Sequence, residues 1–229
     1  MPKTRIPVED FLVNLPLFKD LDRVAIMRFA DGTTEIDAPR ETLVFRRGGP
    51  CAGFHIVVFG QVKLSLETNR GDEKVVELIG PGMSFGEAAM FLGKPHIVTA
   101  ETLTDSKLLH VAKEAVLHEV RRDPDFSRRV IEMLSRRLYQ WTMDLESYTL
   151  RSGTERVVDY LLSHELESVL NGALRVTLPA KKGIIASRLN LTQEHFSRIL
   201  HELMVASLIE VDGRHVRISD IDRLRAYCV

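Results

Sequence analysis

Three polar side chains in the C-terminal third of the chain have the types and the spacing needed to read DNA bases. Glu194, Ser197 and Arg198 occupy positions i, i+3 and i+4, so a helix would present them on one face. An arginine fork binds O6 and N7 of guanine, a glutamate accepts from N4 of cytosine, and a serine hydroxyl adapts to several partners. This spacing predicts a base-reading surface, if a helix carries it.

Segment 181–203 predicts the helix-turn-helix that would carry this surface. Thr192 is a suitable N-cap for the second helix, and Asn190 tolerates the left-handed conformation of a tight turn. Small Ala186 lies where two helices would cross closely. The apolar residues recur at helical spacings and are Ile185, Leu189, Leu191, Phe196, Ile199, Leu200 and Leu203. This pattern is equally typical of a helical hairpin inside a larger core, so the neighbouring segments must decide.

Local charge and a following hairpin favour DNA binding over the core hairpin. Between residues 179 and 201, four basic residues oppose the single acid Glu194. Strand-like segments 208–211 and 214–218 flank Asp212–Gly213, which is a strong turn signal and predicts the wing of a winged helix. The candidate DNA-contacting residues are Thr192, Gln193, Glu194, Ser197, Arg198, Lys182 and Arg188.

A long helix is predicted from Asp123–Pro124 to residue 150. Its apolar residues alternate in steps of three and four, which is typical of a coiled-coil dimer seam; they are Ile131, Leu134, Leu138, Trp141, Leu145 and Tyr148. The alternative is a helix packed on its own barrel. Arg151–Gly153 is interpreted as a hinge, and Thr154 as the cap of a helix that continues to residue 170.

The first half of the chain predicts short helices followed by an antiparallel β structure. Residues 8–30 favour one or two helices, and from about Glu35 short apolar segments alternate with glycine turns. Segment 55–59 is apolar at both alternating positions and predicts a strand buried on both faces. Arg70–Gly71–Asp72 is predicted to form a hairpin tip.

Residues Gly82–Gly86 match the G-x-S-x-G pattern of a hydrolase nucleophile elbow, with Ser84 as the nucleophile. That chemistry requires a strand, a strained turn and a helix in a parallel α/β sheet. The surrounding pattern is all-β without alternating helices. We therefore predict that the protein is not an enzyme and has no catalytic residues.

Composition predicts a protein of two domains that is not generally basic. The chain has 229 residues, of which 45% are hydrophobic and 28% charged, and its formal net charge is −1. Cys51 and Cys228 match no zinc or disulfide framework. No apolar run reaches the length of a membrane span, and the N-terminus lacks a signal-peptide core. We expect a cytoplasmic protein with segments 1–122, 123–150 and 151–229 for sensing, dimerisation and DNA binding.

Taken together, these features resemble one family. A glycine-punctuated β-roll containing PGMSFGE, a long helix and a winged helix containing EHFSRIL resemble the cyclic-AMP receptor protein and fumarate–nitrate reductase regulators, the Crp/Fnr family. The resemblance implies an α+β fold with an N-terminal antiparallel β-roll of the cyclic-nucleotide-binding jelly-roll type. It also implies a homodimer that binds double-stranded operator DNA and RNA polymerase. The pattern Glu194, Ser197, Arg198 implies a TTGA-type half-site in an inverted repeat.

Departures from the family patterns limit the signal that the roll could sense. In the cyclic-AMP branch an Arg–Ser pair follows the Gly–Glu segment and holds the phosphate, whereas this chain has Ile97–Val98–Thr99 there. We therefore expect no cyclic AMP binding, because the phosphate would lack its charged partner. The oxygen-sensing branch uses an N-terminal cysteine cluster, and no cysteine precedes Cys51. We therefore expect no iron–sulfur cluster.

Segment 86–103 instead resembles the cysteine-poor regulators that respond to nitric oxide in nitrate respiration and nitrosative stress. That resemblance implies haem b, for which the chemically suitable ligands are His55, His96, His110 and Met143. The alternatives are a small organic effector or a redox response through Cys51. The predicted effector pocket comprises Phe85, Gly86, Glu87, Val98, Thr99, Leu138 and Trp141.

Overall fold

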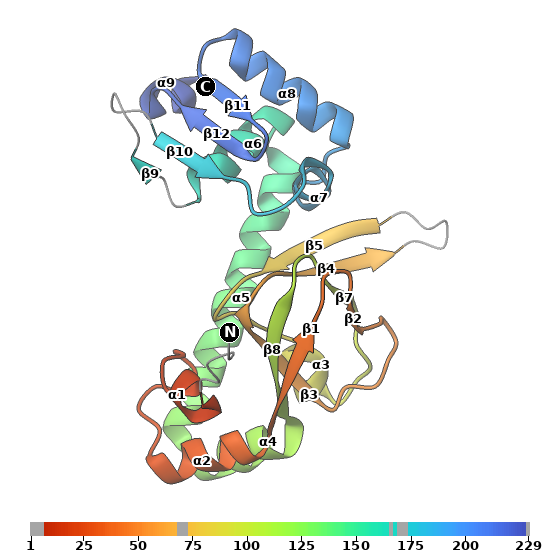
Figure 1. Cartoon of the computed structure of the whole chain (residues 1–229), viewed down its shortest axis with the longest axis vertical. Helices are drawn as coiled ribbons and strands as arrows, with labels where there is room; N and C mark the ends of the chain where they lie inside the picture. The colour runs from red at the N-terminus through yellow and green to blue at the C-terminus, as the bar shows by residue number, and fades with distance from the viewer. Residues whose placement is uncertain (1–6, 68–72, 165–166, 169–173, 228–229) are drawn as a thin grey trace, which may run out of the picture. The chain divides into compact units, whose positions relative to one another are not determined.

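The computed structural model describes residues 7–67, 73–164, 167–168 and 174–227. It forms two compact units, 1–139 and 140–229, whose boundary lies inside the continuous helix α5 (Pro124–Leu150). The first unit is rich in β structure and the second is a winged helix-turn-helix, as Figure 1 shows. The predicted α+β class and the predicted long helix beginning at Pro124 are confirmed.

Two four-stranded antiparallel sheets form the roll of the first unit, with strand orders β1-β8-β3-β6 and β2-β7-β4-β5. Apolar side chains from both sheets pack between them, among them Val57, Phe85 and Leu64. Burial of these alternating side chains explains why the segments form strands rather than loops. The strands are β1 (Thr33–Ala38), β2 (Leu43–Phe45), β3 (Gly53–Phe59), β4 (Val62–Glu67), β5 (Glu73–Ile79), β6 (Ser84–Phe85), β7 (Thr99–Thr102) and β8 (Ser106–Ala112).

The prediction that the central strand is buried along its whole length is wrong at its end. Residues Gly53 to Val57 of β3 are buried, but Phe59 is 50% exposed. The pairing of β3 with β8 shifts register between Val57 and Phe59, and such an irregularity turns the strand away from the core. The predicted hairpin tip 70–72 lies outside the described residues.

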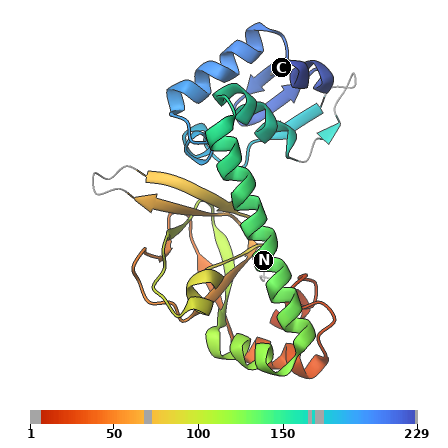
Figure 2. The same ribbon diagram turned by 180° about the vertical axis from the view of Figure 1, so that it is seen from behind.

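Helices gather at one end of the roll, where the chain enters and leaves it (Figure 2). Phe18, Phe29 and Phe126 pack together there, with the rings of Phe18 and Phe29 in edge-to-face contact at 4.9 Å. Phe126 and Val130 thereby bury the first turns of α5 in this core. The remaining helices of the unit are α1 (Val8–Leu12), α2 (Arg23–Asp31), α3 (Glu87–Leu92) and α4 (Lys113–Arg122).

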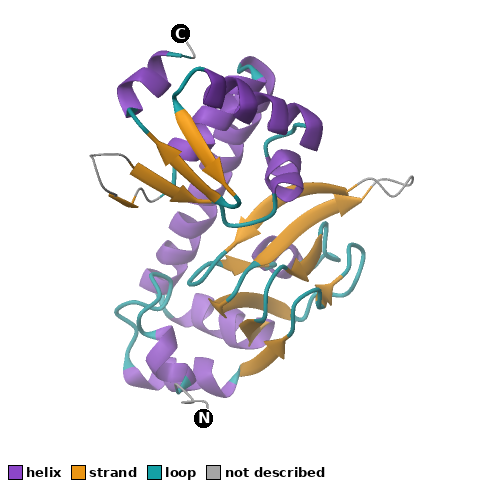
Figure 3. Ribbon diagram, turned by 45° about the horizontal axis from the view of Figure 1, so that its top comes forward, coloured by secondary structure: helices purple, strands orange, loops and turns teal. Residues whose placement is uncertain are grey.

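The second unit confirms the predicted helix-turn-helix and wing (Figure 3). Asn190 has a φ of 57° at the turn, and the Thr192 hydroxyl accepts from the backbone N–H of His195, as a cap does. Its antiparallel sheet has the order β11-β12-β10-β9. The elements are α6 (Gly153–Leu162), β9 (Glu167–Ser168), β10 (Leu174–Thr177), α7 (Lys182–Arg188), α8 (Gln193–Val205), β11 (Ile209–Asp212), β12 (His215–Ile218) and α9 (Ile221–Ala226).

Two boundaries in this unit differ from the predictions. The cap of α6 is Ser152, not Thr154, because Ser152 and Glu155 form a reciprocal capping box. The same helix ends at Leu162 rather than at residue 170, because Glu167 and Ser168 pair with β10 as a strand. In the wing, Asp212 pairs with His215, so the two loop residues are Gly213 and Arg214, one position later than predicted.

Candidate nucleic-acid interface and effector core

One face of α8 carries the predicted base-reading residues. Gln193, Glu194, Ser197 and Arg198 are all exposed, whereas Phe196 on the opposite face is fully buried. Ile199, Leu200 and Leu203 continue that buried face. The helix is therefore held by its apolar side, and its polar face is free to enter a groove.

The same exposed face continues to His201, which the sequence analysis did not single out. His201 lies four residues after Ser197 and three after Arg198, and it is exposed. Its helical spacing from Glu194 would have identified it. Arg198 has its Nε 3.8 Å from Oε1 of Glu202, a weak ion pair on the surface that DNA can displace.

Two of the predicted DNA-contacting residues, Lys182 and Thr192, lie at the starts of α7 and α8. Thr192 is exposed, but its hydroxyl is engaged in capping α8. Lys182 is half-buried at the first position of α7. A Cβ on Gly183 would lie 2.6 Å from Oε1 of Gln193, so glycine leaves room for the Gln193 side chain between the helices.

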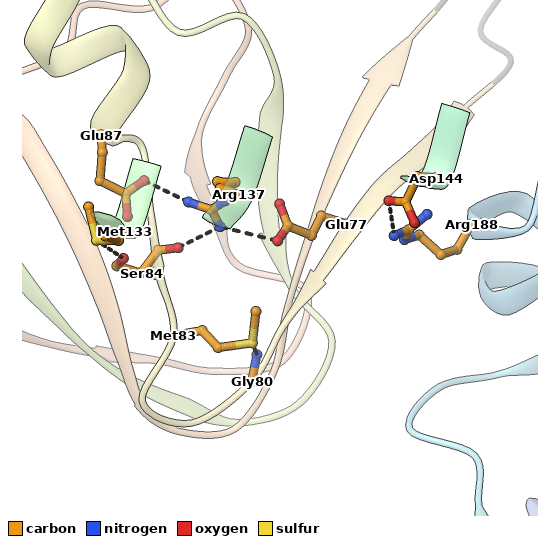
Figure 4. A network of polar contacts seen from close by, with 9 residues as sticks. All are labelled: Glu77, Gly80, Met83, Ser84, Glu87, Met133, Arg137, Asp144 and Arg188. Atoms are coloured by element: carbon orange, nitrogen blue, oxygen red, sulfur yellow. Dashed lines mark hydrogen bonds and ion pairs between the residues drawn. The ribbon is translucent and has the colours of Figure 1, made fainter. Parts of the chain in front are cut away.

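Arg188 is not placed on the exposed reading face. Its side chain is 17% exposed, and its Nη2 lies 2.6 Å from Oδ2 of Asp144 on α5, as the right side of Figure 4 shows. Its guanidinium also donates to the hydroxyl of Tyr148, and that hydroxyl donates to the carbonyl of Arg188 at 2.6 Å. Arg188 therefore ties α7 to the last turns of α5, which we call the α5–α7 clamp (Asp144, Tyr148, Arg188).

Some residues of the predicted dimer seam are exposed to solvent, and others contact residues of their own chain. Ile131, Leu138 and Leu145, seven residues apart, are 64%, 65% and 62% exposed, and Trp141 is 39% exposed. Leu134 is half-buried and packs against the core of the roll. Together with Tyr148 in the clamp, Leu134 shows that α5 serves its own chain as well as leaving an apolar stripe uncovered.

Three of the predicted effector-pocket residues, Phe85, Gly86 and Glu87, lie at the start of α3. Phe85 is fully buried, and Gly86, with a φ of 99°, allows the chain to turn from β6 into α3. Thr99 is buried, and its hydroxyl accepts from the backbone N–H of Arg47. Val98 packs against the core between the sheets. Leu138 is exposed on α5, and Trp141 belongs to the second unit.

Glu87 has a partner that the sequence analysis missed. Its carboxylate is almost completely buried, and Oε2 accepts from Nη1 of Arg137 at 2.9 Å. Nη2 of Arg137 donates to Oε1 of Glu77 at 3.2 Å and to the carbonyl of Ser84 at 2.9 Å (Figure 4). Burial raises the pKa of Glu87, and the charge of Arg137 opposes that rise. Sequence spacing did not reveal Arg137 as this partner, because the spacing of residues along one helix carries no information about contacts with distant strands.

Three of the four predicted haem ligands lie near one another in the roll. His55 pairs across the strands with His110, with ring centroids 4.9 Å apart, and stacks on Phe85 at 5.1 Å. His96 stacks on Phe45 at 3.6 Å. Burial, with the nearby His110 and His96, lowers the pKa of His55 to about 3, so its imidazole is neutral at pH 7. Met143 lies in the second unit, half-buried on α5.

Among the described residues, no group of three or more His, Cys, Asp and Glu side chains is arranged to hold a metal ion by itself. Nδ1 of His55 is nevertheless buried without a hydrogen-bond partner in the described part of the chain. Burial also raises the pKa of the Cys51 thiol, which donates to the carbonyl of Gly53 at 3.2 Å. A raised pKa leaves little thiolate at pH 7, so Cys51 is poorly suited to redox sensing.

The G-x-S-x-G segment does not have the geometry of a nucleophile elbow. Ser84 lies in β6, which pairs antiparallel with β3, whereas the elbow requires a parallel sheet. The Ser84 hydroxyl lies 3.8 Å from Sδ of Met133 on α5. None of the helices in the described part combines the length and apolar character that crossing a bilayer requires.

Comparison with protein families matches both units. Residues 35–123 match the cyclic nucleotide-binding domain, and residues 155–227 match the Crp-like helix-turn-helix domain. The CRP-like cAMP-activated global transcriptional regulator of Mycobacterium tuberculosis is 26% identical over 219 residues, which cover 95% of this chain and 98% of that protein.

Solved structures are similar over nearly the whole length. The structure of FixK2 from Bradyrhizobium japonicum, at 22% identity, has a TM-score of 0.75 and covers 86% of this chain and 98% of that one. The crystal structure of DNR from Pseudomonas aeruginosa is 30% identical with a TM-score of 0.52, and the match covers 96% of each chain. With both domains matched in order and this relative at 30% identity, the chain belongs to the Crp/Fnr family of DNA-binding transcription regulators.

Proposed function

We propose that the protein binds an inverted repeat of TTGA-type half-sites as a homodimer and regulates transcription from it. The exposed polar face of α8 carries this proposal, because Glu194, Ser197 and Arg198 stand on it together. In such a half-site Glu194 accepts from a cytosine, Arg198 forks onto a guanine, and the Ser197 hydroxyl contacts a neighbouring base. RNA polymerase is the proposed protein partner at the promoter.

The exposed stripe on α5 supports the dimer. Ile131, Leu138 and Leu145 repeat every seven residues, which is the period of a two-stranded coiled coil. A twofold axis along this stripe would set two recognition helices roughly 34 Å apart, one turn of DNA. An inverted repeat is the DNA sequence that matches such symmetry.

Titration of a labelled duplex tests this proposal. A duplex carrying a TTGA-type inverted repeat should bind at least a hundredfold more tightly than a scrambled duplex of equal length at about 0.15 M salt, as specific sites do. The affinity should fall steeply as the salt concentration rises, because phosphate contacts release counterions. Equal affinity for both duplexes would reject the assignment.

We further propose that the signal is nitric oxide or nitrosative stress, received through haem. The sequence resemblance of segment 86–103 supports it, and His55, His96 and His110 supply neutral imidazoles, the form that ligates a metal. The donor chemistry fits haem, but the packing does not: His55 and His96 lie against the rings of Phe85 and Phe45. Haem ligation at either residue would require these rings to move.

An absorption spectrum of the haem-reconstituted protein, with and without nitric oxide, tests the signal. A Soret band that shifts with nitric oxide supports it, and loss of that band in a His55→Phe, His96→Phe or His110→Phe variant would identify the ligand. If the spectrum shows no Soret band, or a band that does not change with nitric oxide, haem is rejected as the sensor. The proposed binding to the inverted repeat does not depend on this result.

The second candidate is a regulator gated by a small organic effector other than cyclic AMP. The buried Glu87 at the start of α3 favours this candidate. Its carboxylate lies in the unit that matches the cyclic nucleotide-binding domain, where it can accept a hydrogen bond from a polar ligand. The M. tuberculosis relative is named for cAMP activation, but here Ile97–Val98–Thr99 offers no guanidinium for a phosphate. A melting-temperature screen with metabolites, including cyclic AMP as the expected negative, separates these cases.

A further inference from the structure

His201 extends the exposed face of α8 beyond the base-reading residues. It lies three residues after Arg198 and seven after Glu194, so it stands on their side of the helix. A rise of about 1.5 Å per residue sets it about one turn beyond Arg198, toward the C-terminal end of α8. Its side chain is exposed and makes no hydrogen bond or ion pair with another described residue. The imidazole is thus available to a partner from outside the described part of the chain.

The charges on this face do not favour DNA while His201 is neutral. The exposed charged residues beside it are Glu194, Arg198 and Glu202, two carboxylates against one guanidinium. A helix in the major groove lies between two rows of phosphates, which repel a surface of negative charge. One proton on His201 would make this part of α8 neutral.

Binding of Arg198 to a base would also release a carboxylate next to His201. Nε of Arg198 lies 3.8 Å from Oε1 of Glu202, and this weak pair breaks when the guanidinium forks onto a guanine. Glu202 is exposed and directly follows His201 in the chain. Its carboxylate and the phosphates of the operator would then both favour the protonated form of the imidazole, because opposite charges stabilise it.

The charged groups of the neighbouring elements do not take this role. The elements that pack against α8 are α6, α7 and β11. Most of their charged side chains bind partners other than His201; these are Glu155, Arg156, Asp159, Arg188 and Glu210. Lys182 lies beside the start of α8, since a Cβ on the next residue, Gly183, would meet Gln193. Asp212 lies at the wing turn. His201 is therefore the titratable group best placed to adjust the charge of this face.

We propose that His201 is a further operator-contacting residue and that its imidazole takes up a proton when α8 docks. The proton comes from solvent, and a phosphate oxygen of the DNA accepts the hydrogen bond from the charged ring. Operator affinity then rises as the pH falls from about 8 to 6, where an imidazole gains its charge, and this gain is lost as the pH rises again. This inference rests on the proposed binding to the inverted repeat.

Duplex titrations at pH 8 and pH 6 test the contact. Wild type should bind a single half-site roughly threefold and the inverted repeat roughly tenfold more tightly at pH 6, because the repeat engages His201 of both copies. His201→Gln should match wild type at pH 8 and gain less than about twofold at pH 6, because glutamine does not titrate. His201→Lys carries a fixed charge, so it should bind at both pH values with the affinity that wild type has at pH 6.

A phosphate contact should also appear in the salt dependence. At pH 6 the slope of log affinity against log salt concentration should be steeper than at pH 8 by about one for each copy, because each new phosphate contact releases counterions. In His201→Gln the two slopes should be equal. His195→Gln is the matched control: His195 is the other histidine of α8, and its ring packs beside Gly153 of α6. This variant should keep the wild-type change of affinity between the two pH values.

Calorimetric titration in buffers of different ionisation enthalpy counts the protons directly. At pH 7 the wild-type dimer should take up roughly one proton more than the His201→Gln dimer on binding the inverted repeat, because the imidazole is then only partly charged before binding. Equal proton uptake by the two proteins would overturn the inference. Equal melting temperatures of the two proteins without DNA would exclude a folding defect as the cause of any difference.

Failure of this inference differs from failure of the proposed function. If wild type prefers the inverted repeat but His201→Gln shows the same change of affinity with pH, the role of His201 is rejected and the operator assignment stands. A persistent gain at pH 6 in His201→Lys would reject it as well, because the proton would then bind elsewhere. If wild type binds the repeat and a scrambled duplex equally at both pH values, the proposed function is rejected, and the inference with it.

Discussion

The arginines of this chain have different roles according to how deeply their side chains are buried. Arg198 is exposed on α8, Arg188 is bound to Asp144 and Tyr148, and Arg137 is bound to two buried carboxylates. Arginine cannot lose its charge in a protein, so each guanidinium must find either water, DNA or a carboxylate. Only the exposed residue remains available for an operator.

Arg198→Ala should weaken operator binding by about 1–3 kcal/mol and relax the preference for guanine at one position. The physical reason is the loss of the fork that binds O6 and N7 together. Titration against duplexes with each base at that position measures both effects. Arg198→Lys should retain more affinity than selectivity, and unchanged affinity in Arg198→Ala would remove this residue from the reading face.

His55 should make the first unit less stable in acid. Its pKa in the folded chain is about 3, below the ordinary 6.5, so between these values the unfolded chain takes up a proton that the folded chain does not. The free energy of unfolding is therefore unaffected above pH 6.5 and falls below it, by about 2 kcal/mol at pH 5. Urea unfolding at pH 8 and pH 5 measures this difference.

His55→Phe should remove that part of the pH dependence, because phenylalanine does not titrate. His201→Gln, at an exposed histidine of α8, is the control and should behave as wild type. Equal pH dependence in His55→Phe and wild type would contradict the assignment.

Among the elements, α5 carries the contacts that organise each unit. In the first unit, the roll holds it through Phe126, Leu134 and Arg137. In the second, the α5–α7 clamp joins its last turns to the helix-turn-helix, and Arg156 of α6 donates to the carbonyls of Leu189 and Asn190. These bonds tie both sides of the predicted hinge at 151–153 to α7 and the turn after it.

Substitution of Arg188 should therefore lower stability, whereas substitution of Lys182 should change only the salt dependence of operator binding. Arg188→Ala should destabilise the second unit by about 3 kcal/mol, because Asp144 loses its partner while half-buried. Lys182→Ala should leave stability unchanged and reduce the salt slope of operator binding by about one. Thermal unfolding and salt titration of both variants make the comparison. A reduced salt slope with an unchanged melting temperature in Arg188→Ala would instead indicate that Arg188 contacts a phosphate of the operator.

The whole molecule is a pair of compact units that share one helix and expose an apolar stripe on it. A net charge of −1 supplies no general attraction to DNA, so the proposed operator binding relies on the local surface of α8 and on two copies of the chain. A dimer that places two recognition helices on one duplex binds more tightly than a single copy, although neither copy gains new contacts. In the proposed homodimer, the stripe of Ile131, Leu138 and Leu145 would bring the two copies together.

Leu138→Glu should produce a monomer that loses binding to the inverted repeat. A carboxylate in the centre of the stripe would have to be buried against its symmetry mate at a large desolvation cost. Sedimentation velocity gives the oligomeric state, and duplex titration the affinity. Leu150→Glu, at an exposed leucine off the stripe, should remain dimeric. A dimeric Leu138→Glu would place the interface elsewhere.

Sequence patterns predicted those parts of the fold that depend on local spacing. The heptad steps of α5, Asn190 at the turn and Thr192 as the cap each follow from the geometry of one helix or one turn. The reading face of α8 follows for the same reason, since positions i, i+3 and i+4 must share a side. Boundaries such as the end of α6 were less predictable, because pairing of β9 with β10 overrode helical preference there.

By itself, the sequence determined the order of the elements, the exposed readers and the absence of an arginine at 97–99. Only the tertiary structure decided which ionisable side chains meet: Arg137 with Glu77 and Glu87, Arg188 with Asp144, and neutral His55 with His110. These partners lie between 44 and 60 residues apart in sequence, and no periodicity connects such positions. Their contacts arise when sheets and helices pack, because a buried polar or charged side chain needs a partner, and that partner often comes from another element.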